Sequence, residues 1–358
     1  MTDLDIFRQT VAHEQGDRFL YYFGLTSSLR TRLAAELEVD DNVDIPGRYG
    51  CYRPVAVDPR LAPLGDPDSD IDFGAYFEGI EQPEGSYYDA NGVLHLPGSM
   101  YHFTRYISPL RNATSLSEIE AFPIPAVVPG SDAGMTAAVD AAHAKGKVAF
   151  SHCFHIYENS WQVRGYEQFL MDMMQEPDFC DSILERFFER NHAIAMAAAR
   201  AGADFVRTGD DVANQNGMMF PPDLWWKFIG RRWALIYEDA KRIHPGLKIW
   251  YHSDGNIEAI LDKLIEIGVD IINPVQPECV DVARVFKRYG RSLVIDGGVG
   301  TQTVMPFGTP FDVRSAVENL KSLKRRNTGN ALIVSPTHVL EPEVPTENIV
   351  AMVDAAAG

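Results

Sequence analysis

Residues 248–267 have the sequence KIWYHSDGNIEAILDKLIEI, in which a short β-type run is followed directly by a helical pattern. The run over 248–252 is continuous and apolar up to His252, which is typical of a strand that is covered on both faces. From residue 256 onward, isoleucine and leucine recur near the spacing of one buried helical face. Gly255 permits a tight turn between the two elements. The stretch therefore predicts one strand–helix unit of an α/β protein.

The same alternation extends over most of the chain. Further apolar runs lie at 148–152, 204–208, 270–274, 292–296 and 331–335, and Phe19–Phe23 and a run near 71–75 bring the number of expected strands to eight. Strands that alternate with helices indicate a mostly parallel sheet. Eight units predict a (β/α)8 TIM barrel, whereas six would predict an open doubly wound sheet with a separate N-terminal domain. Polar residues follow most runs, as at the catalytic rim of a barrel, so we expect the barrel.

The N-terminal third is less regular than the remainder. Residues 39–70 contain Pro, Gly and Asp with little periodicity. The sequence Asp-Ala-Asn-Gly at 89–92 indicates a turn, which would join 87–88 to 93–96 as a small hairpin. The regular units are clearest over 145–358. We therefore expect one barrel domain over 1–358 with an irregular N-terminal extension.

The composition narrows the class of partner. The 358 residues include 32 Lys+Arg and 50 Asp+Glu, a formal net charge of −18, which argues against binding to nucleic acid or to an acidic membrane surface. The chain has no apolar stretch long enough to span a membrane and no apolar run at its N-terminus. Its four cysteines are widely spaced, which favours buried thiols in a reducing compartment. We expect a cytoplasmic protein with a small-molecule substrate. The sequence is compatible with both a monomer and an oligomer.

His252 and Asp254 form half of a candidate metal site. Because these residues are two positions apart at the end of a strand, their side chains point the same way. His338 follows the last run and could complete a set of nitrogen and oxygen ligands, which suits Zn²⁺ or a similar divalent cation. Two alternatives stay open: a metal-free site in which these residues hydrogen-bond a substrate, and a capping role for Asp254.

Carboxylates near two strand ends are candidate catalytic groups. Asp210 and Asp211 follow the run at 204–208, and Glu158 follows the run at 148–152. Any of them could act as a general acid or base. Arg207 could pair with one aspartate and keep it ionised. The alternative for the aspartates is the capping of the next turn.

Five further residues are candidates for substrate binding: His155, Tyr157, Trp161, Asn273 and Gln276. The aromatic residues of this set, together with the nearby Arg164, fit an aromatic or carboxylated ligand. Packing of Trp161 on the top of the barrel is the alternative.

Several motifs have a familiar pattern: Trp161–Asp172, Gly209-Asp210-Asp211, His252-Ser-Asp254-Gly255-Asn256, Ile267–Pro277, Pro306–Pro310 and Ser335-Pro-Thr-His338 with Pro345–Ile349. In these motifs the chain resembles the uroporphyrinogen decarboxylase superfamily, most clearly over 145–358. That superfamily contains the decarboxylase itself and zinc-dependent methyltransferases that act with a corrinoid or a thiol. The resemblance implies a single (β/α)8 barrel.

The methyltransferase branch implies a modified zinc site. There, a His-x-Cys motif and a later Cys hold zinc, whereas this chain has Asp254 and His338 at the two Cys positions. Replacement of thiolates by oxygen and nitrogen makes a harder, more Lewis-acidic centre. The resemblance thus implies a metal-dependent methyl- or alkyltransferase acting on a small oxygen-bearing substrate, such as an ether or a carboxylate. Its methyl acceptor could be a corrinoid on a partner protein.

The decarboxylase branch implies an alternative. Its closing motif also has a His at the position of His338, and it needs no metal. Its N-terminal Arg-Gln-Ala-Gly-Arg signature is absent here, where residues 22–30 are YFGLTSSLR, which argues against haem biosynthesis. A metal-independent decarboxylase or lyase acting on a small carboxylate is therefore the second hypothesis. A barrel that binds a ligand without turnover and a mononuclear Fe²⁺ oxygenase are further alternatives.

Overall fold

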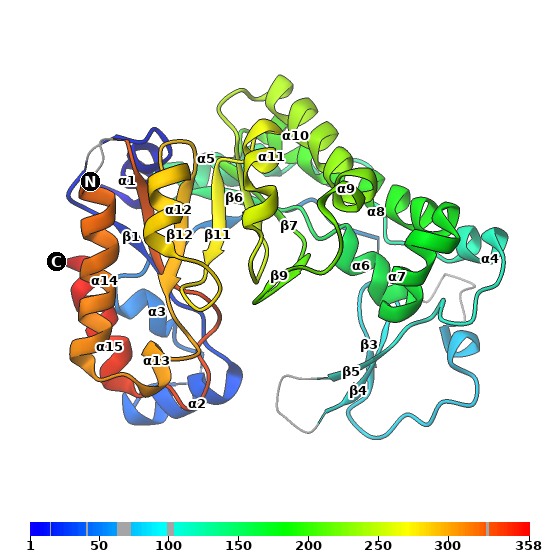
Figure 1. Ribbon diagram of the computed structural model, residues 1–358, viewed down its shortest axis with the longest axis horizontal. Coiled ribbons are helices and arrows are strands. Elements are labelled where there is room, and N and C mark those ends of the chain that lie inside the picture. Colours follow the sequence, from blue (N-terminus) through cyan, green and yellow to red (C-terminus); the bar gives the residue numbers. More distant parts are fainter. Residues whose placement is uncertain (15, 41, 63–72, 99–103, 327–328) are drawn as a thin grey trace.

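The computed structural model describes residues 1–358 except 15, 41, 63–72, 99–103 and 327–328. Its centre is one curled sheet of eight parallel strands, seen in Figure 1. The strand order is β1 (Leu20–Tyr21), β13 (Ala331–Pro336), β12 (Val294–Val299), β11 (Ile271–Val275), β10 (Lys248–His252), β7 (Phe205–Gly209), β6 (Ala149–His152) and β2 (Val55–Ala56). Among these eight strands, those that are adjacent in the sheet also follow one another along the chain, except that the last strand, β13, lies beside the first, β1.

The prediction of a (β/α)8 barrel is confirmed in part. The number, direction and order of the strands agree with it. The sheet is not closed, however, because β1 and β2 form no ladder with each other. A backbone hydrogen bond from Tyr52 N to Tyr21 O, at 2.8 Å, lies at this opening.

The prediction of a strand near 71–75 is wrong for the residues that the structure describes. Residues 71–72 lie outside that part, and Phe73–Phe77 is a short 3₁₀ helix, η1. Its Phe77 is buried against the small sheet described below. The second barrel strand is instead β2, whose two residues are both exposed, so no apolar run marks it in the sequence.

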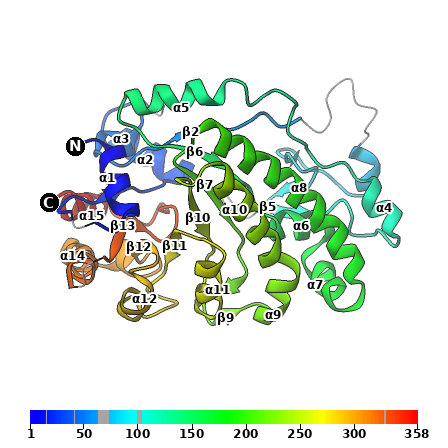
Figure 2. The same cartoon turned by 90° about the horizontal axis from the view of Figure 1, so that it is seen from above.

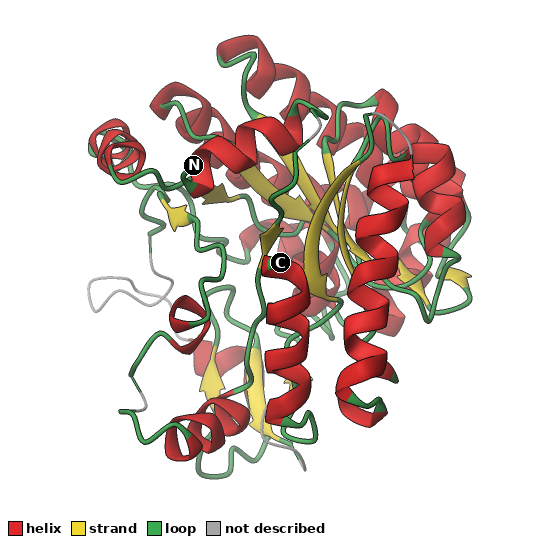
Figure 3. Ribbon diagram, turned by 90° about the vertical axis from the view of Figure 1, so that its left-hand side faces the viewer, coloured by secondary structure: helices red, strands yellow, loops and turns green. Residues whose placement is uncertain are grey.

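Helices cover the outer face of the curled sheet (Figures 2 and 3). They include α5 (Met135–Ala144), α8 (Pro177–Ala201), α10 (Arg231–Ile243), α11 (Leu261–Glu266), α12 (Val282–Tyr289), α14 (Pro310–Arg326) and α15 (Thr346–Ala357). Before α14, Thr309 and Asp312 exchange the two hydrogen bonds of a capping box, which fixes the start of this helix. Shorter elements lie in the connections: α2 (Ser27–Glu36), α3 (Ile45–Arg48), α4 (Leu116–Ala121), α9 (Pro222–Trp225), the π-helical turn η2 (Trp226–Gly230), η3 (Glu258–Ile260), α13 (Val304–Phe307) and the hairpin β8 (Ala213–Asn214) with β9 (Gly217–Met218).

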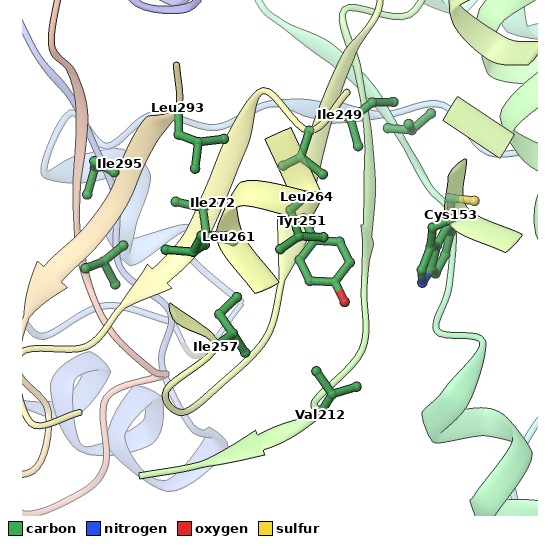
Figure 4. Packing of buried hydrophobic residues seen from close by; sticks show 14 of the residues in the cluster. Cys153, Val212, Ile249, Tyr251, Ile257, Leu261, Leu264, Ile272, Leu293 and Ile295 are labelled. Atoms are coloured by element: carbon green, nitrogen blue, oxygen red, sulfur yellow. The ribbon is translucent and has the colours of Figure 1, made fainter. Parts of the chain in front are cut away.

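Alternation along β10 separates two apolar clusters. Ile249 and Tyr251 point outward into the main core, where Leu261 and Leu264 of α11 meet them (Figure 4). Trp250 belongs to the second cluster, which lies inside the curled sheet near the N-terminal ends of the strands. Because side-chain direction repeats every two residues in a strand, His252 faces the same interior as Trp250.

The predicted hairpin is confirmed and belongs to a separate small sheet. In it, β3 (Tyr87–Tyr88) pairs antiparallel with β4 (Leu94–Pro97), and β4 pairs with β5 (Thr104–Ile107). The Asp89 carboxylate accepts backbone hydrogen bonds from Asn91 and Val93 and so fixes the turn. The small sheet lies beside α6 (Tyr157–Arg164) and α7 (Tyr166–Gln175) in Figure 1.

No helix in the described part of the chain is both long and apolar enough to cross a membrane.

Candidate metal and catalytic site

Asp211, His252 and Asp254 gather where β7 and β10 end. These strands are neighbours, with Gly209 opposite His252. One potential ligand atom from each of the three residues lies within 4.8 Å of the other two. His252 Nε2 is 3.7 Å from Asp211 Oδ1, which also accepts a hydrogen bond of 2.7 Å from the backbone N–H of Asp254. His252 and Asp254 at the end of β10 therefore both contact the carboxylate of Asp211, which follows β7.

A chain of hydrogen bonds fixes the tautomer of His252. The Asp296 carboxylate accepts from the indole N–H of Trp250 at 2.9 Å and from the Tyr22 hydroxyl at 3.1 Å. With its proton directed to Asp296, the Tyr22 oxygen accepts from Asn273 Nδ2 at 3.1 Å. The carbonyl oxygen of Asn273 then faces His252 Nδ1 at 2.8 Å, so Nδ1 carries the hydrogen. His252 Nε2 is left with a free lone pair, as a metal ligand requires.

Asp254 contains an unsatisfied acceptor beside this lone pair. Its Oδ1 is buried and has no hydrogen-bond partner in the part of the chain that the structure describes. The turn that holds it is fixed by Gln276, whose Oε1 accepts from the Gly255 N–H at 2.6 Å. Burial, together with the negative charges of Glu158 and Asp254, raises the pKa of Asp211. A divalent cation would satisfy the orphaned oxygen and relieve this repulsion, so the residues fit such an ion.

A second polar group, His155 with Glu158 and Asp210, adjoins the first. The rings of His155 and His252 are 6.4 Å apart between centroids. His155 Nδ1 lies 2.7 Å from Glu158 Oε2 and 2.7 Å from the Gly209 carbonyl oxygen. Burial lowers the pKa of His155, but the hydrogen bond and charge of Glu158 outweigh burial and raise that pKa to about 9. His155 is consequently a cation at neutral pH.

Asp210 is occupied by contacts within the fold. Its side chain is buried and accepts hydrogen bonds from the backbone N–H groups of Tyr157 and Glu158 and from the indole N–H of Trp233. Burial raises its pKa to about 7 against the effects of these donors and of His155. The carboxylate thus ties the end of β7 to the first turn of α6 and to α10.

Gly209 allows β7 to approach β10 closely. Its φ of +146° lies in a region that L side chains rarely adopt, and a Cβ there would collide with the backbone of His252. Any larger residue would therefore displace the strand end that positions the histidine.

His338 does not join His252 and Asp254 in this structure. The preceding residue, Thr337, is buried and lies 3.1 Å from the hydroxyl of Thr301. His338 itself is exposed, its Nδ1 lies 3.3 Å from the Val339 carbonyl oxygen, and it is absent from the group of potential ligands around His252. Asp211 is the third residue of the group instead.

The aromatic candidates pack within the fold. Tyr157 is fully buried and makes edge contacts with Phe169 and Phe220. Trp161 makes edge contacts with Tyr106 and Tyr166. Both positions agree with packing, the alternative considered for Trp161.

Neither arginine makes the contact expected from the sequence, which was a ligand for Arg164 and one of two aspartates for Arg207. Arg164 is buried and bonds to Asp172 at 2.6 Å, so it is not free for a ligand. Arg207 pairs with neither Asp210 nor Asp211, and its guanidinium lies over the ring of Trp250, 4.3 Å from the centroid.

Trp250 and Tyr22 were not recognised as site residues from the sequence, and Arg207 was expected only to pair with an aspartate. The available signal was the two-residue period of their strands: Trp250 precedes His252 by two positions, and Arg207 precedes Gly209 by two. Both pairs therefore face the interior together.

A family model and a solved structure are similar to this chain. The family model described as uroporphyrinogen decarboxylase (URO-D) matches residues 150–358. Among solved structures, a methyltransferase from Methanosarcina mazei is similar with a TM-score of 0.65 and 14% identity, over 99% of this chain and 98% of that chain. This likeness shows a shared fold. A search of curated protein sequences found no match.

The chain also has a more distant likeness to a glycoside hydrolase. An endo-β-1,4-xylanase of glycoside hydrolase family 10 from Gloeophyllum trabeum has 12% identity and a TM-score of 0.39, over 71% of this chain and 84% of that chain.

Proposed function

The chain belongs to the uroporphyrinogen decarboxylase (URO-D) family, and we propose that it is a metal-dependent methyl- or alkyltransferase whose cation is held by Asp211, His252 and Asp254. The observation that carries this proposal is that a carboxylate oxygen of Asp254 lies within 4.8 Å of a potential ligand atom of His252, while Asp254 Oδ1 is buried without a partner among the described residues. The fold shared with a methyltransferase from Methanosarcina mazei supports the class of enzyme. An oxygen and nitrogen ligand set favours an oxygen-bearing substrate over a thiol.

The groups around the cation site have distinct roles in this proposal. A Zn²⁺-like ion, when bound, polarises a substrate oxygen as a Lewis acid. Asn273 holds the ring of His252 and its tautomer, and Gln276 holds the turn that presents Asp254. As the methyl group passes from the substrate oxygen to a nucleophilic acceptor, that oxygen gains a proton, which cationic His155 supplies.

Glu158 holds His155 in the protonated state through their contact of 2.7 Å. We place Glu158 as the residue that orients and charges this acid, and Asp211 as a cation ligand. The acceptor in this proposal is a corrinoid carried by a partner protein, because a reduced corrinoid is a strong nucleophile toward methyl groups.

Metal reconstitution tests the proposal. Protein stripped with a chelator should gain thermal stability when Zn²⁺, Mn²⁺ or Co²⁺ is added, because an ion that binds only the folded state stabilises it. The variant Asp254→Asn removes the unpartnered anionic oxygen and should lose this response. A wild-type melting temperature that is unchanged by all three ions would overturn the proposal.

A metal-independent carboxy-lyase is the second candidate, and Arg207 is the observation that favours it. This cation lies in an otherwise mostly apolar cavity, where it could hold a carboxylate. Loss of CO₂ leaves an electron pair on carbon, which a proton from His155 would quench. If chelator-treated protein releases CO₂ from a carboxylate substrate as fast as untreated protein does, this candidate is favoured over the transferase.

A further inference from the structure

A cavity of about 310 Å³ lies inside the curled sheet, below the cation site. Its volume is at the lower end of the range for ligand pockets, about 300–1,000 Å³. Six aromatic side chains line it: Phe7, Tyr22, Tyr52, Phe150, Phe205 and Trp250. Two of them, Phe150 and Phe205, are stacked with centroids 5.0 Å apart. The shape and lining suit one small, flat, mostly apolar molecule.

Arg207 projects into this cavity with unused hydrogen-bond donors. Its guanidinium lies flat over Trp250, and no hydrogen bond or ion pair to it occurs among the residues that the structure describes. The side chain is exposed, although β7 is a central strand of the sheet. A guanidinium has five N–H donors in a planar fork, which matches a carboxylate.

The nearby acid makes no ion pair with Arg207, although the two charges act on each other from a distance. Asp296 is the one acid among the described lining residues, and it already accepts hydrogen bonds from Tyr22, Trp250 and Ser335. Arg53 also lines the cavity, but it is paired with Asp44 at 3.1 Å. Among the described lining residues, Arg207 is therefore the cation whose hydrogen-bond donors are left for a ligand within aromatic walls.

We propose that this cavity binds a small aromatic carboxylate, with its carboxylate on Arg207 and its ring among the aromatic side chains. The inference rests on the proposed function and names the substrate class of that site. A single planar cation on apolar walls fits a monovalent, planar anion, whereas a phosphate group would call for several donors.

The cavity borders the residues that orient His252. Tyr22, Trp250 and Asp296 line it, and they also form the hydrogen-bonded chain that reaches Asn273. The ring of Trp250 is stacked on that of His252, with centroids 5.9 Å apart and planes 8° apart. A ligand held there contacts the groups directly beneath the cation site.

Calorimetric titration with benzoate, and with neutral benzamide as its isostere, tests the inference on the full chain. Wild type should bind benzoate more tightly than benzamide. Arg207→Met should weaken benzoate about 10- to 100-fold, as expected for the loss of charge-assisted hydrogen bonds, and leave benzamide within twofold. The affinity of Arg207→Lys for benzoate should lie between those of wild type and Arg207→Met, because lysine keeps the charge but lacks the planar fork of donors.

Arg53→Met is the matched control and should leave benzoate affinity within twofold, since Arg53 is already paired. Equal affinity of wild type and Arg207→Met for benzoate, or no benzoate binding to wild type, would overturn the inference. Zn²⁺ content measured on the same samples reports on the proposed function separately. Wild type that holds its metal but does not bind benzoate would overturn this inference alone, whereas wild type that binds benzoate without metal would overturn the proposed function alone.

Discussion

His252 donates its Nδ1 hydrogen to Oδ1 of Asn273 at 2.8 Å, and the opposite nitrogen of the ring faces Asp211. Asn273 comes from β11 and His252 from β10, which pair at these two residues. The orientation of the amide follows from its second contact, with the Tyr22 hydroxyl. Asn273 of β11 and Tyr22, which follows β1, thus determine which nitrogen of His252 is available to a cation.

Replacement of Asn273 by alanine should weaken metal binding. Without its carbonyl oxygen, His252 loses the partner that fixes its tautomer and ring orientation, and such losses typically cost about 10- to 100-fold in metal affinity. The measurement is a competition titration of Zn²⁺ against a chelator of known affinity.

Tyr22→Phe is the matched control for this experiment. It removes the hydroxyl that orients the Asn273 amide but keeps the contact between Asn273 and His252, so its effect should be smaller than that of Asn273→Ala. Equal Zn²⁺ affinity of wild type and Asn273→Ala would contradict the role given to Asn273.

Replacement of Arg164 by methionine should destabilise the fold. Arg164 and Asp172 are each 3% exposed, and Arg164 also donates to the carbonyl oxygens of Leu110 and Ala113. The variant leaves a buried carboxylate without its partner, which costs about 3–5 kcal/mol. Urea unfolding gives the change in free energy. A second substitution, Asp172→Leu, should recover part of the loss, and a loss below 1 kcal/mol in the single variant would argue against this role.

The charge of His155 predicts a pH dependence of stability. Its pKa is raised from 6.5 to about 9 in the folded protein, so its contribution is fully present below pH 6.5 and is lost as the pH rises through 9. Chelator-treated wild type should therefore lose stability between these values more steeply than His155→Gln. Urea unfolding of both proteins across this range is the measurement, and parallel curves would show that His155 does not titrate as stated.

Replacement of Gly209 by alanine should disturb the site through the backbone. The added Cβ would meet the backbone of His252, so both the free energy of unfolding and the Zn²⁺ affinity should fall. Gly202→Ala is the control, because Gly202 also has a positive φ, of +80°, but has open space around its Cβ position. The control should lose about 1–2 kcal/mol and keep its Zn²⁺ affinity. Unchanged Zn²⁺ affinity in Gly209→Ala would refute the proposed close approach.

The sequence predicted seven of the barrel strands because each contains a buried apolar segment, as in Ile271–Val275. It missed β2, since a two-residue strand at the sheet opening needs no apolar pattern. The hairpin was predicted correctly because Asp89 and the following Asn-Gly specify the turn locally.

The composition of the site was harder to predict than the fold. His252 and Asp254 share one short motif, so their proximity follows from strand geometry alone. Whether Asp211 or His338 lies beside them depends on how two other loops turn, and no local pattern encodes that. The inward position of Arg207 was available from the period of its strand, but its lack of an acidic partner required the packing of the whole interior.

Metal content of protein purified without chelator is the measurement that tests the central claim most directly, with wild type, Asp254→Asn and His338→Ala prepared in parallel. We predict about one equivalent of divalent metal per chain in wild type and in His338→Ala, and less than about a tenth of that in Asp254→Asn. The expectation follows from the placement of Asp254 beside His252 and of His338 away from both. Background metal in wild type, or loss of metal in His338→Ala with retention in Asp254→Asn, would contradict the claim.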